Sequence, residues 1–152
     1  MIQRAGIDMT TKVQREAIVQ ELRRRGIRVT AQRVAVAEAI LGTAEHLTVQ
    51  EIYQRVCRHL PHITMGTIYN TLEVLMAKGL IQPLPFPGGT RYDTDPTPHV
   101  NVLCIRCGQV CDLHDDGGYL ERLAELASQR TGFQPLSQQV AIYALCPSCR
   151  PR

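Results

Sequence analysis

The alternation of apolar and polar residues predicts four helices in the first half of the chain. Each segment has apolar residues at helical spacing, and a threonine able to cap a helix precedes or begins three of them. Thr48 and Glu51 have the spacing of a capping box, and Gly26 and Gly79 are suited to end the first and fourth segments. The helices are expected at residues 13–25, 31–41, 48–59 and 65–78.

A β-hairpin is predicted after these helices. Leu80–Leu84 and Thr90–Asp93 flank the turn-rich segment Pro85–Gly89. Helices followed by a hairpin have the order of a winged helix-turn-helix domain, expected over residues 1–94. The two prolines of Asp95–Pro98 favour extended backbone, so we expect a hinge there.

The pattern changes beyond the hinge and predicts a small α/β unit over residues 95–152. Strands are expected at residues 99–105, 109–113 and 138–145, with an amphipathic helix over 118–131. A unit of this size buries little core of its own, and metal binding or self-association usually supports such units. We therefore expect a homodimer formed through this half.

Charge and hydropathy limit the class of protein. The net charge is +3, and residues 1–95 contain the whole excess, with 12 Lys/Arg against 9 Asp/Glu. This excess alone does not establish nucleic-acid binding. No apolar run is long enough to cross a bilayer, and the chain begins Met1-Ile-Gln-Arg4 without the apolar segment of a signal peptide. We expect a soluble, cytoplasmic protein with no membrane partner.

Four of the six cysteines form two Cys-x-x-Cys pairs, Cys104 with Cys107 and Cys146 with Cys149. Two such knuckles can supply four thiolates to one tetrahedral ion, which suits structural Zn²⁺. Disulfides are the weaker alternative, because the cytosol keeps thiols reduced. A closed four-thiolate site has no open position for substrate. The regulated chemistry is therefore expected elsewhere, in a protein that is no enzyme.

The fold class predicted from these features is α+β. It comprises an N-terminal winged helix-turn-helix and a small C-terminal α/β dimerisation domain with a four-cysteine zinc site.

Residues able to bind a second metal gather around the hinge. A nitrogen and oxygen donor set is harder than four thiolates, and it suits Fe²⁺ or Mn²⁺. His99 and Asn101 lie two apart on a predicted strand and therefore share a face. The candidate ligands of this regulatory site are His46, Asp93, His99, Asn101 and Asp112.

Three further cysteine and histidine residues are not included among the candidate ligands. Cys57 is expected to be a small core residue, and Cys111 should face away from Asp112 on the same strand. His114 is interpreted as a surface residue, although it lies close enough in sequence to be a spare ligand.

The fourth predicted helix is the expected recognition helix. In a helix-turn-helix the second helix enters the major groove of DNA with its early residues. Asparagine can form two hydrogen bonds with adenine, and upstream arginines can neutralise phosphates. The candidate DNA-binding residues are Arg28, Arg33, Thr67, Tyr69 and Asn70.

Several motifs together resemble the ferric uptake regulator family of metal-dependent repressors. They are Arg28–Arg33, Thr67–Leu72 and the two cysteine knuckles with the stretch between them. The resemblance covers about residues 20 to 150. It implies binding of a dimer to palindromic double-stranded operator DNA, structural zinc and a regulatory metal at the hinge. It also implies that Tyr69 contacts bases and that Arg28 reaches a minor groove.

The peroxide-sensing branch of the family is most similar in motif. Asn70 after the tyrosine and Asp112 at the hinge resemble that branch, in which bound Fe²⁺ reacts with peroxide and a ligand histidine is oxidised. His46 and His99 would be the targets. Asn101 departs from the His-x-His pattern of the family, which leaves its coordination open.

The leading hypothesis is a repressor that responds to peroxide through Fe²⁺ or Mn²⁺ at the hinge. One alternative is a regulator of the same family that senses iron or zinc supply without peroxide chemistry. Alternatives of another class are a rubredoxin-like redox protein and an unregulated zinc-containing binding module.

Overall fold

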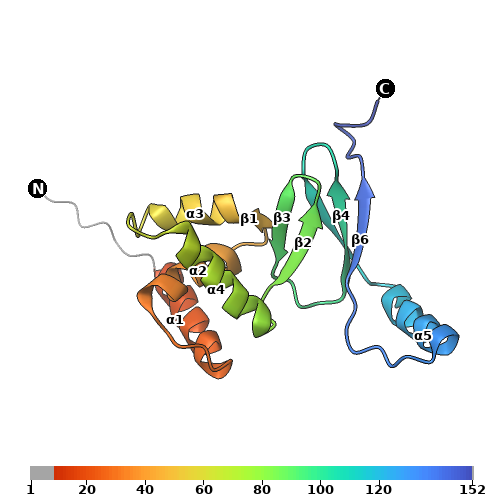
Figure 1. Cartoon of the computed structure of the whole chain (residues 1–152), viewed down its shortest axis with the longest axis horizontal. Helices are drawn as coiled ribbons and strands as arrows, with labels where there is room; N and C mark the ends of the chain where they lie inside the picture. The colour runs from red at the N-terminus through yellow and green to blue at the C-terminus, as the bar shows by residue number, and fades with distance from the viewer. Residues whose placement is uncertain (1–8, 152) are drawn as a thin grey trace, which may run out of the picture. The chain divides into compact units, whose positions relative to one another are not determined.

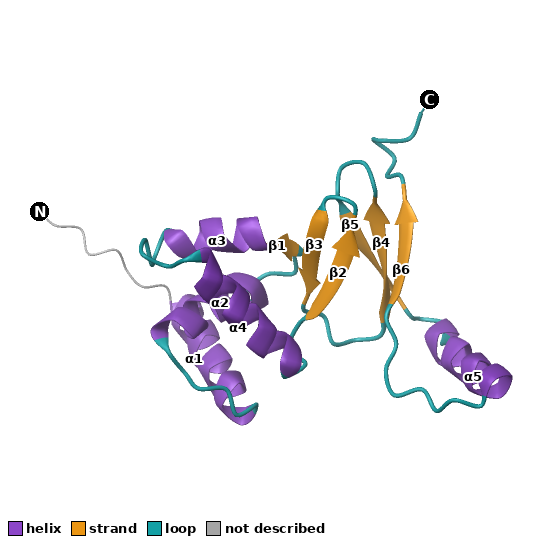
Figure 2. Ribbon diagram, in the orientation of Figure 1, coloured by secondary structure: helices purple, strands orange, loops and turns teal. Residues whose placement is uncertain are grey.

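The computed structural model describes residues 9–151, which form five helices and two small sheets (Figures 1 and 2). The chain divides into two compact units. The first contains the residues up to Pro83 together with Thr90–Asp95, and the second contains Leu84–Gly89 and the residues from Pro96 onward. The predicted α+β class is confirmed. No helix within residues 9–151 has the length and apolar character needed to cross a membrane.

The first unit contains four helices, and their threonine caps are those the sequence predicts. Thr30 and Thr64 each accept a hydrogen bond from the backbone N–H three residues later, and Thr48 and Glu51 form both bonds of a capping box. Capping satisfies backbone donors that the first helical turn leaves unpaired. The helices are α1 Met9–Arg24, α2 Ala31–Leu41, α3 Val49–Cys57 and α4 Met65–Ala77.

The core of the first unit lies between its four helices, with Leu22 contributed by α1. Ile68, Leu72 and Leu75 of α4 are fully buried, as their spacing predicts, and Ile40 and Ile52 meet them from α2 and α3.

Helix α1 differs from its prediction at its N-terminal end. It begins at Met9 rather than at residue 13, and the side chain of Val13 is 65% exposed. Ala17 is exposed as well, and burial of this helix begins at Ile18. Helical spacing predicts that Val13 and Ala17 face the core with Ile18 and Leu22. This prediction is wrong, because the first turns of α1 do not pack on the core.

A three-stranded sheet completes the winged-helix topology. Its strands are β1 Leu47–Thr48, β2 Gln82–Phe86 and β3 Gly89–Asp93, in the order β1-β3-β2. Strand β1 was not predicted from the sequence. Pro85 was expected in the turn, but Pro83 and Pro85 both lie within β2. An edge strand accepts proline because some of its backbone nitrogens need no partner in the sheet.

The second unit is built on the sheet β5-β4-β6. Strands β4 (His99–Cys104) and β5 (Val110–His114) are antiparallel, and β6 (Val140–Ala144) pairs with β4 in parallel. The connection between β5 and β6 contains α5, Tyr119–Thr131, in which Leu120 is the buried apolar residue (Figure 2). Many large apolar side chains of this unit are exposed: Ile105, Leu113, Tyr119, Leu123, Leu126, Phe133, Leu136, Ile142 and Tyr143.

Candidate metal centres and DNA-binding face

The pairing of β4 with β6 brings the two cysteine knuckles together. The strands are parallel, and Cys104 pairs with Ala144, so both knuckles follow their strands at the same end of the sheet. In the first knuckle Gly108 adopts a φ of 74°, and its N–H donates to the carbonyl of Cys104 at 2.9 Å. The guanidinium of Arg106 donates to the carbonyl of Cys149 at 2.8 Å and ties the two turns together.

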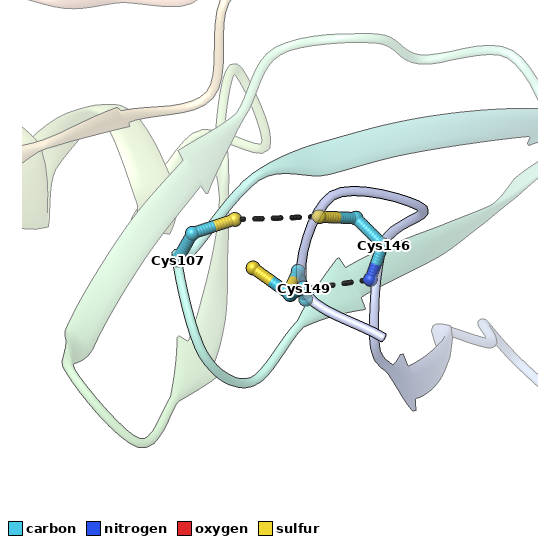
Figure 3. A group of neighbouring side chains, drawn as sticks. Cys107, Cys146 and Cys149 are labelled. Atoms are coloured by element: carbon cyan, nitrogen blue, oxygen red, sulfur yellow. Dashed lines mark hydrogen bonds between the residues drawn. The ribbon is translucent and has the colours of Figure 1, made fainter. Parts of the chain in front are cut away.

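The four cysteines have the spacing of a tetrahedral metal site. Their sulfur atoms all lie within 4.8 Å of one another, and Cys107 Sγ is 3.7 Å from Cys146 Sγ (Figure 3). A regular tetrahedron with zinc–sulfur bonds of about 2.3 Å has sulfur atoms about 3.8 Å apart. All six cysteines lie in the described part of the chain, and all are free thiols. The geometry fits zinc and does not support disulfides.

The local environment shifts the acidity of two of these thiols in opposite directions. Hydrogen bonds from the backbone N–H groups of Cys146 and Cys107 lower the pKa of Cys104 to about 6. A side-chain hydrogen bond with Cys146, followed by burial, raises the pKa of Cys149 to about 12. Clustered thiols resist simultaneous ionisation without a cation, so a divalent ion here displaces protons on binding.

Within the first unit, His46 and Asp93 lie opposite each other. Strand β1 pairs with β3 so that Leu47 faces Tyr92, and this register places His46 beside Asp93. His46 Nε2 is 3.7 Å from Asp93 Oδ1, and both side chains are buried. This separation is too long for a strong hydrogen bond. Two donors each about 2.1 Å from one ion lie about 3 to 4 Å apart, so the pair can share a metal.

Within the second unit, three more candidate ligands share one face of the β5-β4-β6 sheet. Asn101 pairs directly with Asp112 across β4 and β5, and His99 pairs with His114. Residues directly opposite in an antiparallel pair point to the same face. His114 therefore lies on this face as well, with its ring centroid 6.3 Å from that of His99. Cys111 alternates to the other face, as the sequence predicts.

The ring of His99 is oriented for coordination through one nitrogen. Nδ1 lies 2.7 Å from the carbonyl oxygen of Thr97, which can only accept, so Nδ1–H is the donor. In the neutral ring, Nε2 then keeps its lone pair. This type of second hydrogen bond fixes the tautomer of metal-binding histidines in general. The contact with Thr97 could not be predicted from the sequence, because every residue type has a backbone carbonyl.

The candidate recognition helix presents two polar side chains to solvent. Tyr69 is 47% exposed and Asn70 is exposed, while the preceding residue, Ile68, is fully buried in the core of the first unit. The hydroxyl of Thr67 lies 3.0 Å from the Thr64 hydroxyl at the N-cap of α4. Thr67 is thus engaged in the helix cap.

The two candidate arginines differ in their surroundings. Arg28 is exposed, whereas the guanidinium of Arg33 donates to the backbone carbonyl of Arg28 at 3.1 Å. Arg33 therefore holds the backbone from which Arg28 extends. Two other arginines upstream of the recognition helix, Arg24 and Arg25, form ion pairs with Glu21.

Comparison with known proteins assigns the chain to one family. The model of the ferric uptake regulator family matches residues 24–143. The chain belongs to this family. Its sequence is similar to the peroxide-responsive repressor PerR of Staphylococcus saprophyticus, with 33% identity over 144 residues, 94% of this chain and 96% of that protein.

Solved structures of ferric uptake regulator family members have the same fold. The Helicobacter pylori ferric uptake regulator, described with three functional metal binding sites, gives a TM-score of 0.74 at 19% identity, covering 93% of this chain and 95% of that one. The Campylobacter jejuni peroxide stress regulator gives 0.69 at 25% identity, covering 88% and 97%. The predicted family resemblance is confirmed.

Proposed function

We propose that this member of the ferric uptake regulator family is a dimeric repressor that binds operator DNA when Fe²⁺ or Mn²⁺ occupies a hinge site, and that releases DNA after reaction with peroxide. The observation that supports this most is the existence of two preorganised sets of hard ligands on either side of the hinge. The first set is His46 with Asp93, and the second is His99 with Asn101 and Asp112.

The proposed regulatory site joins these two sets around one ion. Imidazole, carboxylate and amide oxygen suit Fe²⁺ or Mn²⁺ better than they suit a structural zinc site. Because the two sets belong to separate compact units, an ion bound by both would hold the units at one angle. That angle would match two recognition helices to half-sites about one turn of DNA apart.

Structural zinc is proposed at Cys104, Cys107, Cys146 and Cys149. The sulfur spacing supports this assignment, as does the absence of a fifth ligand group near the cluster among the described residues. The ion would stabilise a unit that otherwise buries few apolar side chains. Zinc sites of this type contribute on the order of 10 kcal/mol to folding.

Residues 1–94 are proposed to bind DNA, and residues 95–152 to form the dimer. Arg28, Tyr69 and Asn70 are exposed on the first unit, and Arg33 and Thr67 would support them. On the second unit, the exposed apolar residues Tyr119, Leu123 and Leu126 lie at helical spacing on α5 and offer a surface that a second copy of this chain could cover. Such exposure on an unpartnered monomer is unusual.

Peroxide sensing is proposed at His46 or His99. Bound Fe²⁺ would supply the redox chemistry, and peroxide would transfer one oxygen atom to an imidazole carbon and leave as water. The Nδ1–H bond of His99 to Thr97 would keep its Nε2 directed to the ion. The PerR name of the Staphylococcus saprophyticus relative supports this function over simple sensing of iron or zinc supply.

Mass spectrometry of the zinc-loaded protein tests the peroxide response. We expect peroxide to add the mass of one oxygen atom to a peptide with His46 or His99 when Fe²⁺ is bound, and to add nothing when Mn²⁺ is bound. Oxidation confined to cysteines in both forms would contradict the proposal. It would favour the alternative of a metal-supply regulator.

A further inference from the structure

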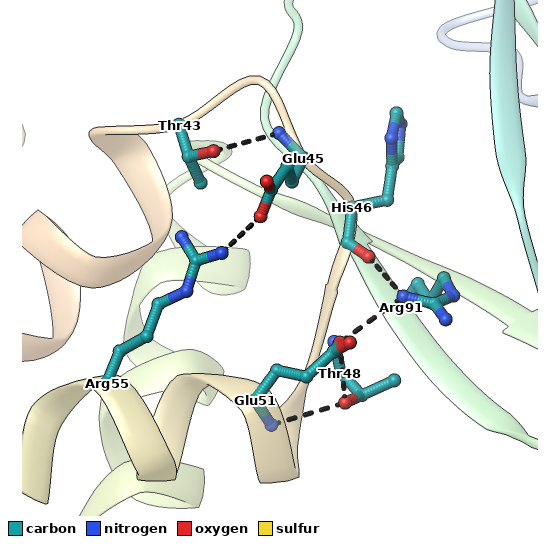
Figure 4. A network of polar contacts seen from close by, with 7 residues as sticks. All are labelled: Thr43, Glu45, His46, Thr48, Glu51, Arg55 and Arg91. Atoms are coloured by element: carbon teal, nitrogen blue, oxygen red, sulfur yellow. Dashed lines mark hydrogen bonds and ion pairs between the residues drawn. The ribbon is translucent and has the colours of Figure 1, made fainter.

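Arg91 of β3 connects the backbone of His46 to the start of helix α3. Its Nη1 atom donates to the carbonyl oxygen of His46 at 2.7 Å. The same atom lies 3.3 Å from Oε2 of Glu51, the third residue of α3 (Figure 4). The Arg91 side chain is 18% exposed and the Glu51 side chain is 45% exposed, so solvent screens part of this ion pair.

Glu51 is itself held firmly by the capping box of α3. Its carboxylate accepts from the backbone N–H of Thr48 at 2.7 Å and from the Thr48 hydroxyl at 2.8 Å. Burial alone would raise the pKa of Glu51, but the hydrogen bonds from Thr48 and the charge of Arg91 outweigh it and lower the pKa. The carboxylate is therefore charged at neutral pH and provides a fixed anchor for the guanidinium.

The contact with His46 involves its backbone carbonyl and not its imidazole. Arg91 donates to the carbonyl, and the ring points away from the guanidinium (Figure 4). Strand pairing of Thr48 with Arg91 constrains the same short segment a second time. His46, Thr48 and the first turn of α3 are thus joined through one arginine.

We propose that Arg91 is a positioning residue that couples His46 to the capping box of α3, the first helix of the helix-turn-helix. The inference rests on the proposed function, in which His46 binds the regulatory metal. Arg91 fixes the backbone from which the imidazole reaches the ion, and it transmits the ordering of His46 to the N-terminus of α3. Coupling of this kind is reciprocal, so α3 also influences metal affinity.

Arg55 of α3 offers a matched control for Arg91. It forms an ion pair with Glu45, the residue before His46 (Figure 4), but these side chains are 37% and 65% exposed. Arg55 lies near the same loop and has the same charge, yet it does not bond the His46 carbonyl or the capping box in the contacts described. It tests whether any arginine near His46 has the same effect.

The experiment measures Mn²⁺ affinity of the zinc-loaded protein by titration calorimetry. We expect Arg91→Met to weaken Mn²⁺ binding roughly tenfold, within the range of about 10–100-fold for residues that orient metal ligands. Arg55→Met should leave the affinity unchanged. Equal losses for both variants, or none for Arg91→Met, would overturn the proposal.

A double-mutant cycle separates positioning from general destabilisation. In the His46→Ala background, Arg91→Met should cause no further loss of affinity, because it acts through His46. An additive loss would overturn the proposal and assign Arg91 a structural role. If His46→Ala alone leaves Mn²⁺ affinity unchanged, the proposed metal site itself is wrong. Should Arg91→Met fail to fold, Glu51→Gln in both backgrounds decides the same question, since it removes the negative charge that pairs with Arg91 and keeps an oxygen that can accept the capping hydrogen bonds.

Discussion

His46 Nε2 lies 3.7 Å from Asp93 Oδ1, although 46 residues of chain, with helices α3 and α4, lie between the two residues. The short pairing of β1 with β3 creates this relationship. Asp93 Oδ1 also accepts a hydrogen bond from the backbone N–H of Asp95 at 2.9 Å, which fixes the carboxylate where the wing meets the hinge. The pairing of β1 with β3 thus brings two candidate ligands together within the first unit.

Removal of the Asp93 charge should weaken binding of the regulatory metal. We expect Asp93→Asn to lower Mn²⁺ affinity by more than the roughly 10–100-fold typical of residues outside the ligand set. Glu45→Gln is the control, because it removes a nearby exposed carboxylate that pairs with Arg55. Calorimetric titration of both variants checks this. Equal affinities for Asp93→Asn and the parent protein would exclude Asp93 as a ligand.

Two substitutions of Asn101 are expected to change Fe²⁺ affinity in opposite directions. Asn101 is 2% exposed and lies directly opposite Asp112, on the same face of the sheet. Imidazole is a stronger ligand than amide oxygen for Fe²⁺, so Asn101→His should raise Fe²⁺ affinity, and Asn101→Ala should lower it. Competition with a coloured chelator under anaerobic conditions measures both. An unchanged affinity in Asn101→Ala would show that Asn101 does not coordinate.

Disruption of the cysteine cluster should destabilise the second unit. Cys107→Ser removes one ligand, and we expect loss of zinc and a large drop in the thermal midpoint, since the ion contributes on the order of 10 kcal/mol to folding. Cys111→Ser is the matched control, because Cys111 is an exposed thiol outside the cluster. Zinc content and thermal unfolding are the measurements. Full zinc retention in Cys107→Ser would refute the four-thiolate site.

The exposed apolar side chains of α5 predict self-association. Leu126 is 47% exposed and Leu123 is 46% exposed, so a charge there would be buried if the dimer covers this helix. We expect Leu126→Glu to shift the zinc-loaded protein from dimer to monomer in sedimentation equilibrium. Val13→Glu, on the exposed start of α1, is the control and should remain dimeric. A monomeric parent protein would contradict the dimer.

Local sequence signals were sufficient to predict most elements of the fold. Thr30, Thr64 and the Thr48–Glu51 capping box mark helix starts that the structure confirms. These signals involve residues three or four apart, so their physics is contained in a short segment. The knuckle spacing of the cysteines is equally local.

Relationships created by long-range pairing could not be predicted. Strand β1 has two residues, too few for an alternating pattern, and it exists because β3 pairs with it. The contacts of His46 with Asp93 and of Arg91 with the His46 carbonyl depend on that pairing. The exposure of Val13 could not be predicted either. Helical spacing shows which residues share one face of a helix, but it does not show how far along the helix the neighbouring helices pack on that face.

The central claim is that a metal at the hinge controls DNA binding, and one titration tests it directly. A duplex selected from a random pool by the Mn²⁺-loaded dimer is titrated at fixed salt with zinc-loaded protein, with and without Mn²⁺. Fixed salt is needed because phosphate contacts make affinity salt-dependent.

Asn70→Ala reports on base contacts in the same assay, with an expected loss of about 1–3 kcal/mol. We predict that Mn²⁺ strengthens DNA binding of the parent protein at least tenfold and has no effect on Asp93→Asn. Equal DNA affinity of the parent protein with and without Mn²⁺ would contradict the account.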